Sequence, residues 1–125
     1  MPLRYEIDPQ ANVVRIIGTG HLSMTEMIAT VDELAEDPQF RSGVPVIFDI
    51  RQARYEAGLE DGDLFAAALK RREADFQGRF ALVVSESIQV LAKLYCVVAK
   101  VAGVERMSCF TDVDEAIAWC GESSN

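Results

Sequence analysis

The sequence predicts one α/β domain whose sheet is mostly parallel, holds about five strands and opens with a β-hairpin. Three observations support this fold class. The chain has 125 residues, half of them hydrophobic, which suits a single core. Its opening segment shows the alternation of a half-buried strand, followed by turn-forming residues. Beyond it, β-branched apolar runs alternate with segments of helical spacing, which requires crossover connections between parallel strands.

The opening hairpin is predicted from a period of two. Apolar and polar residues alternate from residue 3 to residue 8, as in a strand with one buried face. Residues 8–12 carry turn chemistry, and the β-rich run 13–17 returns as the second strand. We expect the three residues Gly18–Gly20 to end that strand.

The first helix has a start signal and a stop signal. Ser23 and Glu26 have the spacing of a capping box, and Pro38 ends the helical pattern. The apolar positions between these signals recur at helical spacing: Met27, Ile28, Val31 and Leu34. The apolar run 44–50 then predicts a central strand covered on both faces. Residues 51–62 are expected to form a polar connection.

The remaining elements are predicted in the order helix 63–76, strand 80–84, helix 88–102, strand 106–110 and a last helix starting at 111–114. Gly78 breaks the first of these helices, Ser87 can cap the second, and Gly103 can close it. The last helix is expected to turn four residues inward: Ala116, Ile117, Trp119 and Cys120. The complete order is β-β-α-β-α-β-α-β-α. It forms one domain over residues 1–121, with 122–125 as a tail.

Charge and cysteine usage exclude several classes of function. The net charge of −8 makes nucleic acid a poor partner, because phosphate binding needs clustered lysine and arginine. No apolar run reaches the roughly 18–20 residues that span a bilayer, and the first residues lack the apolar core of a signal peptide. The odd set Cys96, Cys109 and Cys120 indicates free thiols in a reducing cytoplasm rather than disulfides or a zinc site. Cys109, in a strand-like alternation, is expected to be buried and inert.

Four stretches together resemble one known family. "GHLSMTEM" matches a strand-to-helix step, and "VIFDI" matches a central strand ending in Asp. "RFALVVSES" matches a fourth strand with its turn, and "CFTDVDEAIAWC" matches a closing strand-helix pattern. The chain thereby resembles the STAS-like fold and, within it, the SpoIIAA-like (anti-sigma-factor-antagonist-like) family. The resemblance implies a binding or regulatory module rather than an enzyme.

Two further implications come with this resemblance. Members of the antagonist branch carry a phosphorylatable serine at the start of the second helix, but no serine or threonine occurs here between Gly43 and Val84. That phosphoserine switch therefore does not carry over. Acidic Glu60 and Asp61 occupy the matching region, where they favour a helix N-terminus through its dipole. The SpoIIAA-like branch also resembles lipid-binding domains of the CRAL-TRIO kind, which implies an apolar or amphiphilic ligand as an alternative.

Polar residues at the carboxyl ends of the predicted strands are the candidates for chemistry. Ligands of open α/β sheets bind beyond those ends, a rule that gathers five side chains: Asp49, Arg51, Ser85, Ser87 and Thr111. Asp49 lacks the companion acids of a phosphate-accepting receiver site. We expect it to accept hydrogen bonds from the amides that follow it, or to pair with Arg51 or Arg54. No cofactor or metal site is indicated, because the single histidine and the unpaired cysteines do not form a ligand set.

The helix 88–102 has more apolar surface than one sheet face requires. One narrow stripe of the helix holds four residues, all of them polar except Cys96: Gln89, Lys93, Cys96 and Lys100. A helix that covers a sheet needs an apolar stripe of only a little over 100°. The surplus must be buried by a neighbouring helix of the same domain, by a second chain or by a ligand. We expect a protein partner, a second copy or a ligand to contact four of its residues: Leu91, Leu94, Tyr95 and Val98.

Three functional hypotheses follow, from different classes. The first is a non-enzymatic regulatory or protein-interaction module, which binds a protein partner or forms a homodimer. The second is a carrier or sensor of an apolar ligand, held between the second and third helices. The third is a small hydrolase that uses His21 as the base for Ser85 or Ser87. A deep apolar cavity would favour the second hypothesis, and a Ser–His hydrogen bond the third.

Overall fold

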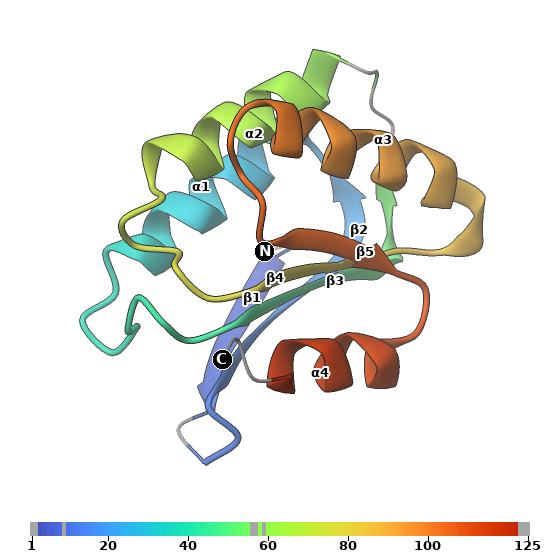
Figure 1. Cartoon of the computed structure of the whole chain (residues 1–125). Coiled ribbons are helices and arrows are strands. Elements are labelled where there is room, and N and C mark those ends of the chain that lie inside the picture. The colour runs from blue at the N-terminus through green and yellow to red at the C-terminus, as the bar shows by residue number, and fades with distance from the viewer. Residues whose placement is uncertain (1–2, 9, 56–57, 59, 123–125) are drawn as a thin grey trace.

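A computed structural model describes residues 3–8, 10–55, 58 and 60–122, and these form the predicted order of elements (Figure 1). The strands are β1 (Leu3–Asp8), β2 (Val13–Leu22), β3 (Val46–Tyr55), β4 (Phe80–Val83) and β5 (Met107–Phe110). The helices are α1 (Met24–Ala35), α2 (Glu60–Arg71), α3 (Gln89–Val101) and α4 (Val113–Gly121), and the 3₁₀ turn η1 (Glu86–Ile88) precedes α3.

The five strands form one sheet in the order β1-β2-β3-β4-β5. β1 and β2 pair antiparallel as a hairpin, and the other neighbours pair parallel. Helices α1, α2 and α3 lie side by side on one face of the sheet, and α4 lies on the opposite face (Figure 1). The fold is thus the mixed, mostly parallel α/β architecture that the sequence predicts.

Each face of the sheet has its own apolar cluster. The larger cluster fills the space under α1, α2 and α3, and the fully buried rings of Phe48 and Phe65 lie within it, edge to face at 6.2 Å. The smaller cluster lies under α4, where Ala116 packs on alternate residues of the central strands: Ile47, Ala81 and Val83. Coverage on both faces explains why β3 and β4 begin as continuous apolar runs.

Two helix ends are as predicted. Ser23 accepts a hydrogen bond from the amide of Glu26, and the Glu26 carboxylate accepts one from the Ser23 amide, which completes the capping box. At the end of α3, Gly103 has a φ of +97°, a left-handed conformation that glycine adopts without strain. Its amide bonds to the carbonyl of Lys100, and the amide of Val104 bonds to that of Ala99. This paired arrangement is a Schellman cap.

The two strands β2 and β3 are longer than predicted. Gly18–Gly20 do not end β2, which continues to Leu22 through a register shift between Ile17 and Thr19. The expected polar connection after Ile50 is in fact the second half of β3, whose last residue Tyr55 pairs with Leu22. β4 ends at Val83, opposite Asp49. The extension of β3 therefore pairs with β2 alone, and most of its side chains are exposed and polar.

Three helix expectations are wrong in detail. α2 runs over Glu60–Arg71 instead of 63–76, because its acidic first turn lies before Asp63. Ser87 does not cap α3, since it lies within η1 and its hydroxyl bonds to that of Ser85 at 2.9 Å. Ile117 does not turn inward and is 43% exposed.

Within the described residues, no helix is long and apolar enough to cross a membrane.

Candidate functional site

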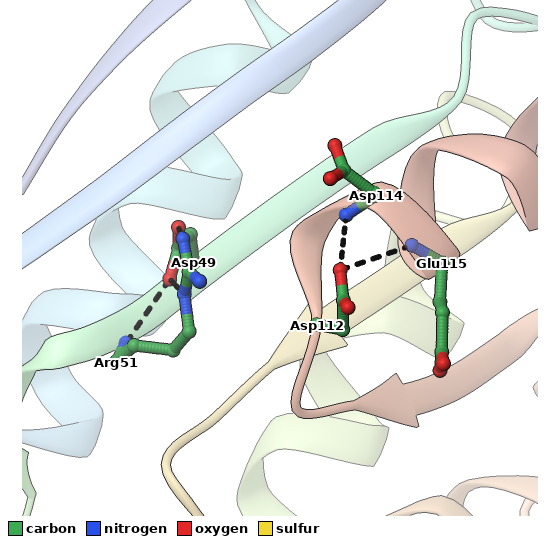
Figure 2. A network of polar contacts seen from close by, with 5 residues as sticks. All are labelled: Asp49, Arg51, Asp112, Asp114 and Glu115. Atoms are coloured by element: carbon green, nitrogen blue, oxygen red, sulfur yellow. Dashed lines mark hydrogen bonds and ion pairs between the residues drawn. The ribbon is translucent and has the colours of Figure 1, made fainter.

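Asp49 is buried at the carboxyl end of the apolar part of β3, on the face that α4 covers. Its Oδ1 accepts hydrogen bonds from the amide of Arg51 at 3.1 Å and from Nε of the same residue at 3.0 Å. Its Oδ2 accepts one from Nη2 at 2.8 Å. The guanidinium group of Arg51 thus forms a bidentate ion pair with both carboxylate oxygens of Asp49 (Figure 2). This confirms the interpretation of Asp49 as a bonded residue that pairs with Arg51.

The N-terminus of α4 lies beside this ion pair (Figure 2). Asp112 caps the helix, because its Oδ1 accepts from the amides of Asp114 at 2.7 Å and Glu115 at 3.4 Å. The hydrogen bonds to Asp49 raise the pKa of Arg51 most, and the carboxylates of Asp112 and Asp114 add to that rise. The arrangement stabilises a permanent cation. Among the described residues, no group of three acidic, histidine or cysteine side chains could hold a metal ion.

Replacing Asp49 by asparagine is expected to lower the free energy of unfolding by about 1–2 kcal/mol, because the charge-assisted bonds to Arg51 are lost. Urea denaturation followed by circular dichroism measures the change. Glu115→Gln is the matched control, since it removes the same charge from the same end of the sheet. Among the described residues only the backbone amide of Glu115 is bonded, to Asp112, so this variant should stay within about 0.5 kcal/mol of the wild type. Equal stability of the two variants contradicts a structural role for the ion pair.

The hydroxyl and imidazole candidates do not form a catalytic arrangement among the described residues. Ser85 and Ser87 bond to each other through their hydroxyl oxygens at 2.9 Å. His21 is exposed and pairs in register with Arg54, far along β3 from the point where β4 ends. Thr111 follows β5 and is half-buried. No Ser–His hydrogen bond is formed in the part of the chain that the structure describes.

Tyr95 belongs to the interior of the domain, which corrects its expected place at an interface. Only 4% of its surface is exposed, and its ring packs edge to face on that of Tyr55 with centroids 6.3 Å apart. The Tyr55 hydroxyl lies 3.0 Å from the Tyr95 hydroxyl, which donates in turn to the carbonyl of Gly58 at 2.7 Å. Burial, followed by the bond to Tyr95, raises the pKa of Tyr55. The pair ties α3 to the end of β3.

The expected apolar ligand site between α2 and α3 is almost filled by side chains. The cavity there has a volume of about 10 Å³, which is at most enough for one water molecule. Its lining comes mainly from the sheet, α2 and α3: Met27, Ile50, Tyr55, Phe65, Leu82, Val84, Ile88, Leu91, Ala92 and Tyr95. An amphiphile does not fit this space as it stands.

The exposed side of α3 holds a ridge of large apolar side chains. Val90 is 74% exposed, Leu94 43%, Val97 58% and Val101 84%. These four residues, which we call the α3 ridge, follow one another at steps of four, three and four, so they line one narrow face of the helix. Of the residues expected to meet a partner, Leu94 belongs to the ridge. Leu91 and Val98 are half-buried beside it and pack on the core.

The sequence pattern hid the ridge because α3 is apolar on most sides. Its buried contacts come from Ala92, Tyr95 and Ala99. Small side chains at Ala92 and Ala99 allow the helix backbone to approach the sheet closely. Which apolar face remains outside is therefore decided by the rotation of the helix about its axis. The spacing of residues along α3 predicts which face carries the lysines, but it does not predict which apolar face packs on the sheet.

Two of the three thiols lie on α3 and on the edge strand β5. Cys96 and Cys109 are both half-buried and pack against the larger apolar cluster. Cys109 is therefore not the buried side chain that its alternation predicted. Interaction with the Cys96 thiol lowers the pKa of the Cys109 thiol to about 7, and the ammonium group of Lys93 contributes to that fall.

Comparison with known proteins identifies the fold. The sequence matches no known family profile and no curated protein. The structure matches the crystal structure of an uncharacterized protein from the DUF3478 family with a SpoIIAA-like fold, from Shewanella loihica PV-4. The TM-score is 0.59, the sequence identity 14%, and the match covers 94% of this chain and 91% of the other. At that identity the likeness shows the fold alone, and it confirms the SpoIIAA-like fold over nearly the whole chain.

Proposed function

We propose that the protein is a non-enzymatic interaction module that docks a protein partner on the α3 ridge. The observation that carries this proposal is the exposure of four large apolar side chains in one row on a single helix. Single exposed apolar residues are ordinary, but contiguous exposed patches mark contact sites. A row at steps of four, three and four is also the seam that a second amphipathic helix would pack against.

The charges around the ridge indicate the kind of partner. α3 contains no acidic residue, and its two charged residues, Lys93 and Lys100, border the ridge on the side of β5. Although the chain as a whole has a net charge of −8, the charge that borders the ridge is positive. An antiparallel pair of identical α3 helices would bring these lysines against each other. A partner helix with apolar residues flanked by acidic ones complements the surface better than a second copy does.

The other two hypotheses have less support. A hydrolase needs His21 near a serine, whereas Ser85 and Ser87 bond to each other. A carrier of an apolar ligand needs a cavity, whereas the space between α2 and α3 is about 10 Å³. The interaction module requires neither. Its regulation differs from that of the phosphorylated antagonists, because the matching region has no serine or threonine.

The test uses two synthetic helical peptides with the same leucine heptad seam, one flanked by glutamates and the other by lysines. Binding is measured by fluorescence anisotropy. We expect the glutamate-flanked peptide to bind more tightly, and Val97→Glu to weaken its binding at least about tenfold, because a charge at the centre of an apolar contact is left desolvated. Ala29→Glu, on the exposed side of α1, adds the same charge away from the ridge and should leave binding unchanged.

Sedimentation equilibrium of the protein alone separates the two kinds of partner. We expect the wild type to sediment as a monomer at the concentrations used for peptide binding. A dimer that Val97→Glu dissociates would identify the partner as a second copy and overturn the preference for an acidic helix. Equal affinity for both peptides, or equal binding by Val97→Glu, would contradict docking on the ridge.

A further inference from the structure

Strand β1 forms one edge of the sheet, and the strand is neither bulged nor interrupted. It comes first in the strand order, with β2 on one side and no strand on the other side among the described residues. Its register with β2 runs without a shift from Leu3 to Asp8, and residues 3–8 contain no proline. Successive residues of a strand direct their amides and carbonyls to opposite edges. Every second residue of β1 therefore directs its backbone groups to the open edge, where a further strand can pair.

A groove of about 430 Å³ lies between this edge strand and α1. Its lining comes from both elements: Leu3, Arg4, Tyr5, Glu26, Ala29, Thr30 and Glu33. The hydroxyl of Tyr5 donates to the carboxylate of Asp37 at 2.8 Å, which ties β1 to the segment after α1. A strand added to an edge beside a helix places its alternate side chains in such a groove. The open edge and the groove thus suit the same ligand, an extended polypeptide segment.

The acidic wall of the groove indicates the composition of that segment. α1 contains three acidic residues and no basic one. Asp32 bonds to Arg72 at 3.0 Å, on the side of α2. Glu26 and Glu33 line the groove, and neither forms an ion pair with a lysine or arginine within the described part of the chain. Basic side chains in the groove would complement these two carboxylates.

Arg4, the basic residue of the lining, does not neutralise this wall. Its neighbours Leu3 and Tyr5 pack on the larger apolar cluster, under the helices. Because side chains alternate along a strand, that of Arg4 is directed to the opposite face of the sheet. Glu6 and Asp8 lie on the same face as Arg4, at steps of two along β1.

We propose that β1 accepts an extended basic segment of another protein as an additional edge strand, with lysine or arginine side chains in the groove. The aliphatic stems of these side chains lie on the apolar floor at Leu3 and Ala29, and their charged ends reach Glu26 and Glu33. The two glutamates are seven positions apart, about 10 Å along a helix. Alternate residues of a strand are about 7 Å apart, so two or three basic side chains span the groove.

A second copy of the chain suits this edge less well. Pairing of two β1 strands would bring two α1 helices toward each other, each with Glu26 and Glu33 on the side that faces the new seam. Those like charges repel. The site is also separate from the α3 ridge, because α2 lies between α1 and α3 (Figure 1). A basic strand at β1 and an acidic helix at α3 can therefore be bound together.

The first test separates strand pairing from simple charge attraction. The probe is a labelled seven-residue peptide with lysine at alternate positions and threonine between them, and fluorescence anisotropy measures its binding. Two N-methylated forms carry the same charges, one methylated at the lysine amides and the other at the threonine amides. An added strand bonds to β1 through only one of these sets, so one form should lose at least about tenfold in affinity and the other should keep most of it. Equal binding by the two forms would overturn the proposal.

The second test uses two variants with the same change of charge. Glu33→Lys reverses a charge in the groove, and Glu105→Lys reverses one before β5, at the other edge of the sheet; both residues are exposed. We expect Glu33→Lys to weaken binding of the lysine peptide at least about fivefold, and Glu105→Lys to change it by less than about twofold. Equal effects of the two variants would contradict binding in the groove.

Amide hydrogen exchange locates the peptide. On saturation, exchange in residues 3–8 should slow, because amides at the open edge become bonded, whereas exchange in α3 should not change. Protection of α3 without protection of β1 would place the peptide on the α3 ridge and refute the site at β1. A wild-type dimer that the lysine peptide dissociates in sedimentation equilibrium would assign the open edge to a second copy and would also overturn the proposal.

Discussion

Tyr95→Asp is expected to unfold the protein, with a loss of about 4 kcal/mol or more in the free energy of unfolding. Tyr95 is 4% exposed, and its ring fills the space between Tyr55 and the backbone of Gly62. The fit is so close that a Cβ added at Gly62 would lie 2.8 Å from Cδ1 of the Tyr95 ring. The charged groups that act on Tyr95 are the carboxylates of Asp61 and Glu60, which would repel a carboxylate in that place. It also removes the bonds to Tyr55 and to the carbonyl of Gly58.

The matched control is Val97→Asp, two residues further along the same helix. Val97 is 58% exposed, so the new carboxylate stays in water and stability should change by less than about 1 kcal/mol. Tyr95→Phe keeps the ring and loses only the hydroxyl bonds, at a cost of about 1–2 kcal/mol. Urea denaturation of the three variants gives the order. A folded Tyr95→Asp protein with wild-type stability would show that this ring does not hold α3 in place.

The sequence predicts well those features that depend on neighbouring residues. The capping box at Ser23, the Schellman cap at Gly103 and the alternation in β1 are each set within a few positions along the chain. The order of strands and helices follows from the same local patterns. Four short stretches were therefore sufficient to indicate the SpoIIAA-like fold that the structural match confirms.

Features that depend on distant partners could not be predicted in the same way. The second half of β3 is polar, because it pairs with β2 alone and extends past β4, so it has no apolar signal. The Asp49–Arg51 pair was within reach, since the two residues are neighbours on one face of a strand. The burial of Tyr95 was not, because it depends on the position of α3 over the sheet. The α3 ridge depends on the same packing.

At Gly78, the loop between α2 and β4 packs closely against the loop that precedes β3. We expect this backbone contact to be sensitive to an added side chain. A Cβ at Gly78 would lie 2.7 Å from the carbonyl oxygen of Gly43 and 2.8 Å from that of Val44. These are backbone atoms, which cannot turn aside as a side chain can. The segments are tied together, since the amides of Gln77 and Gly78 both donate to the carbonyl of Ser42, at 2.8 and 3.2 Å.

Gly78→Ala is therefore expected to lower the free energy of unfolding by about 2–3 kcal/mol, the upper part of the range of about 1–3 kcal/mol that is usual for a forced backbone shift. The shift would be felt directly in the sheet, because the two loops lead into β3 and β4, where the amide of Val46 donates to the carbonyl of Arg79 at 2.9 Å. Gly43→Ala is the control, since a Cβ there meets nothing within 4 Å. It should leave stability unchanged or raise it by about 0.5 kcal/mol, because alanine narrows the unfolded ensemble. Thermal unfolding of both variants decides the matter, and equal midpoints would show that the loops separate at little cost.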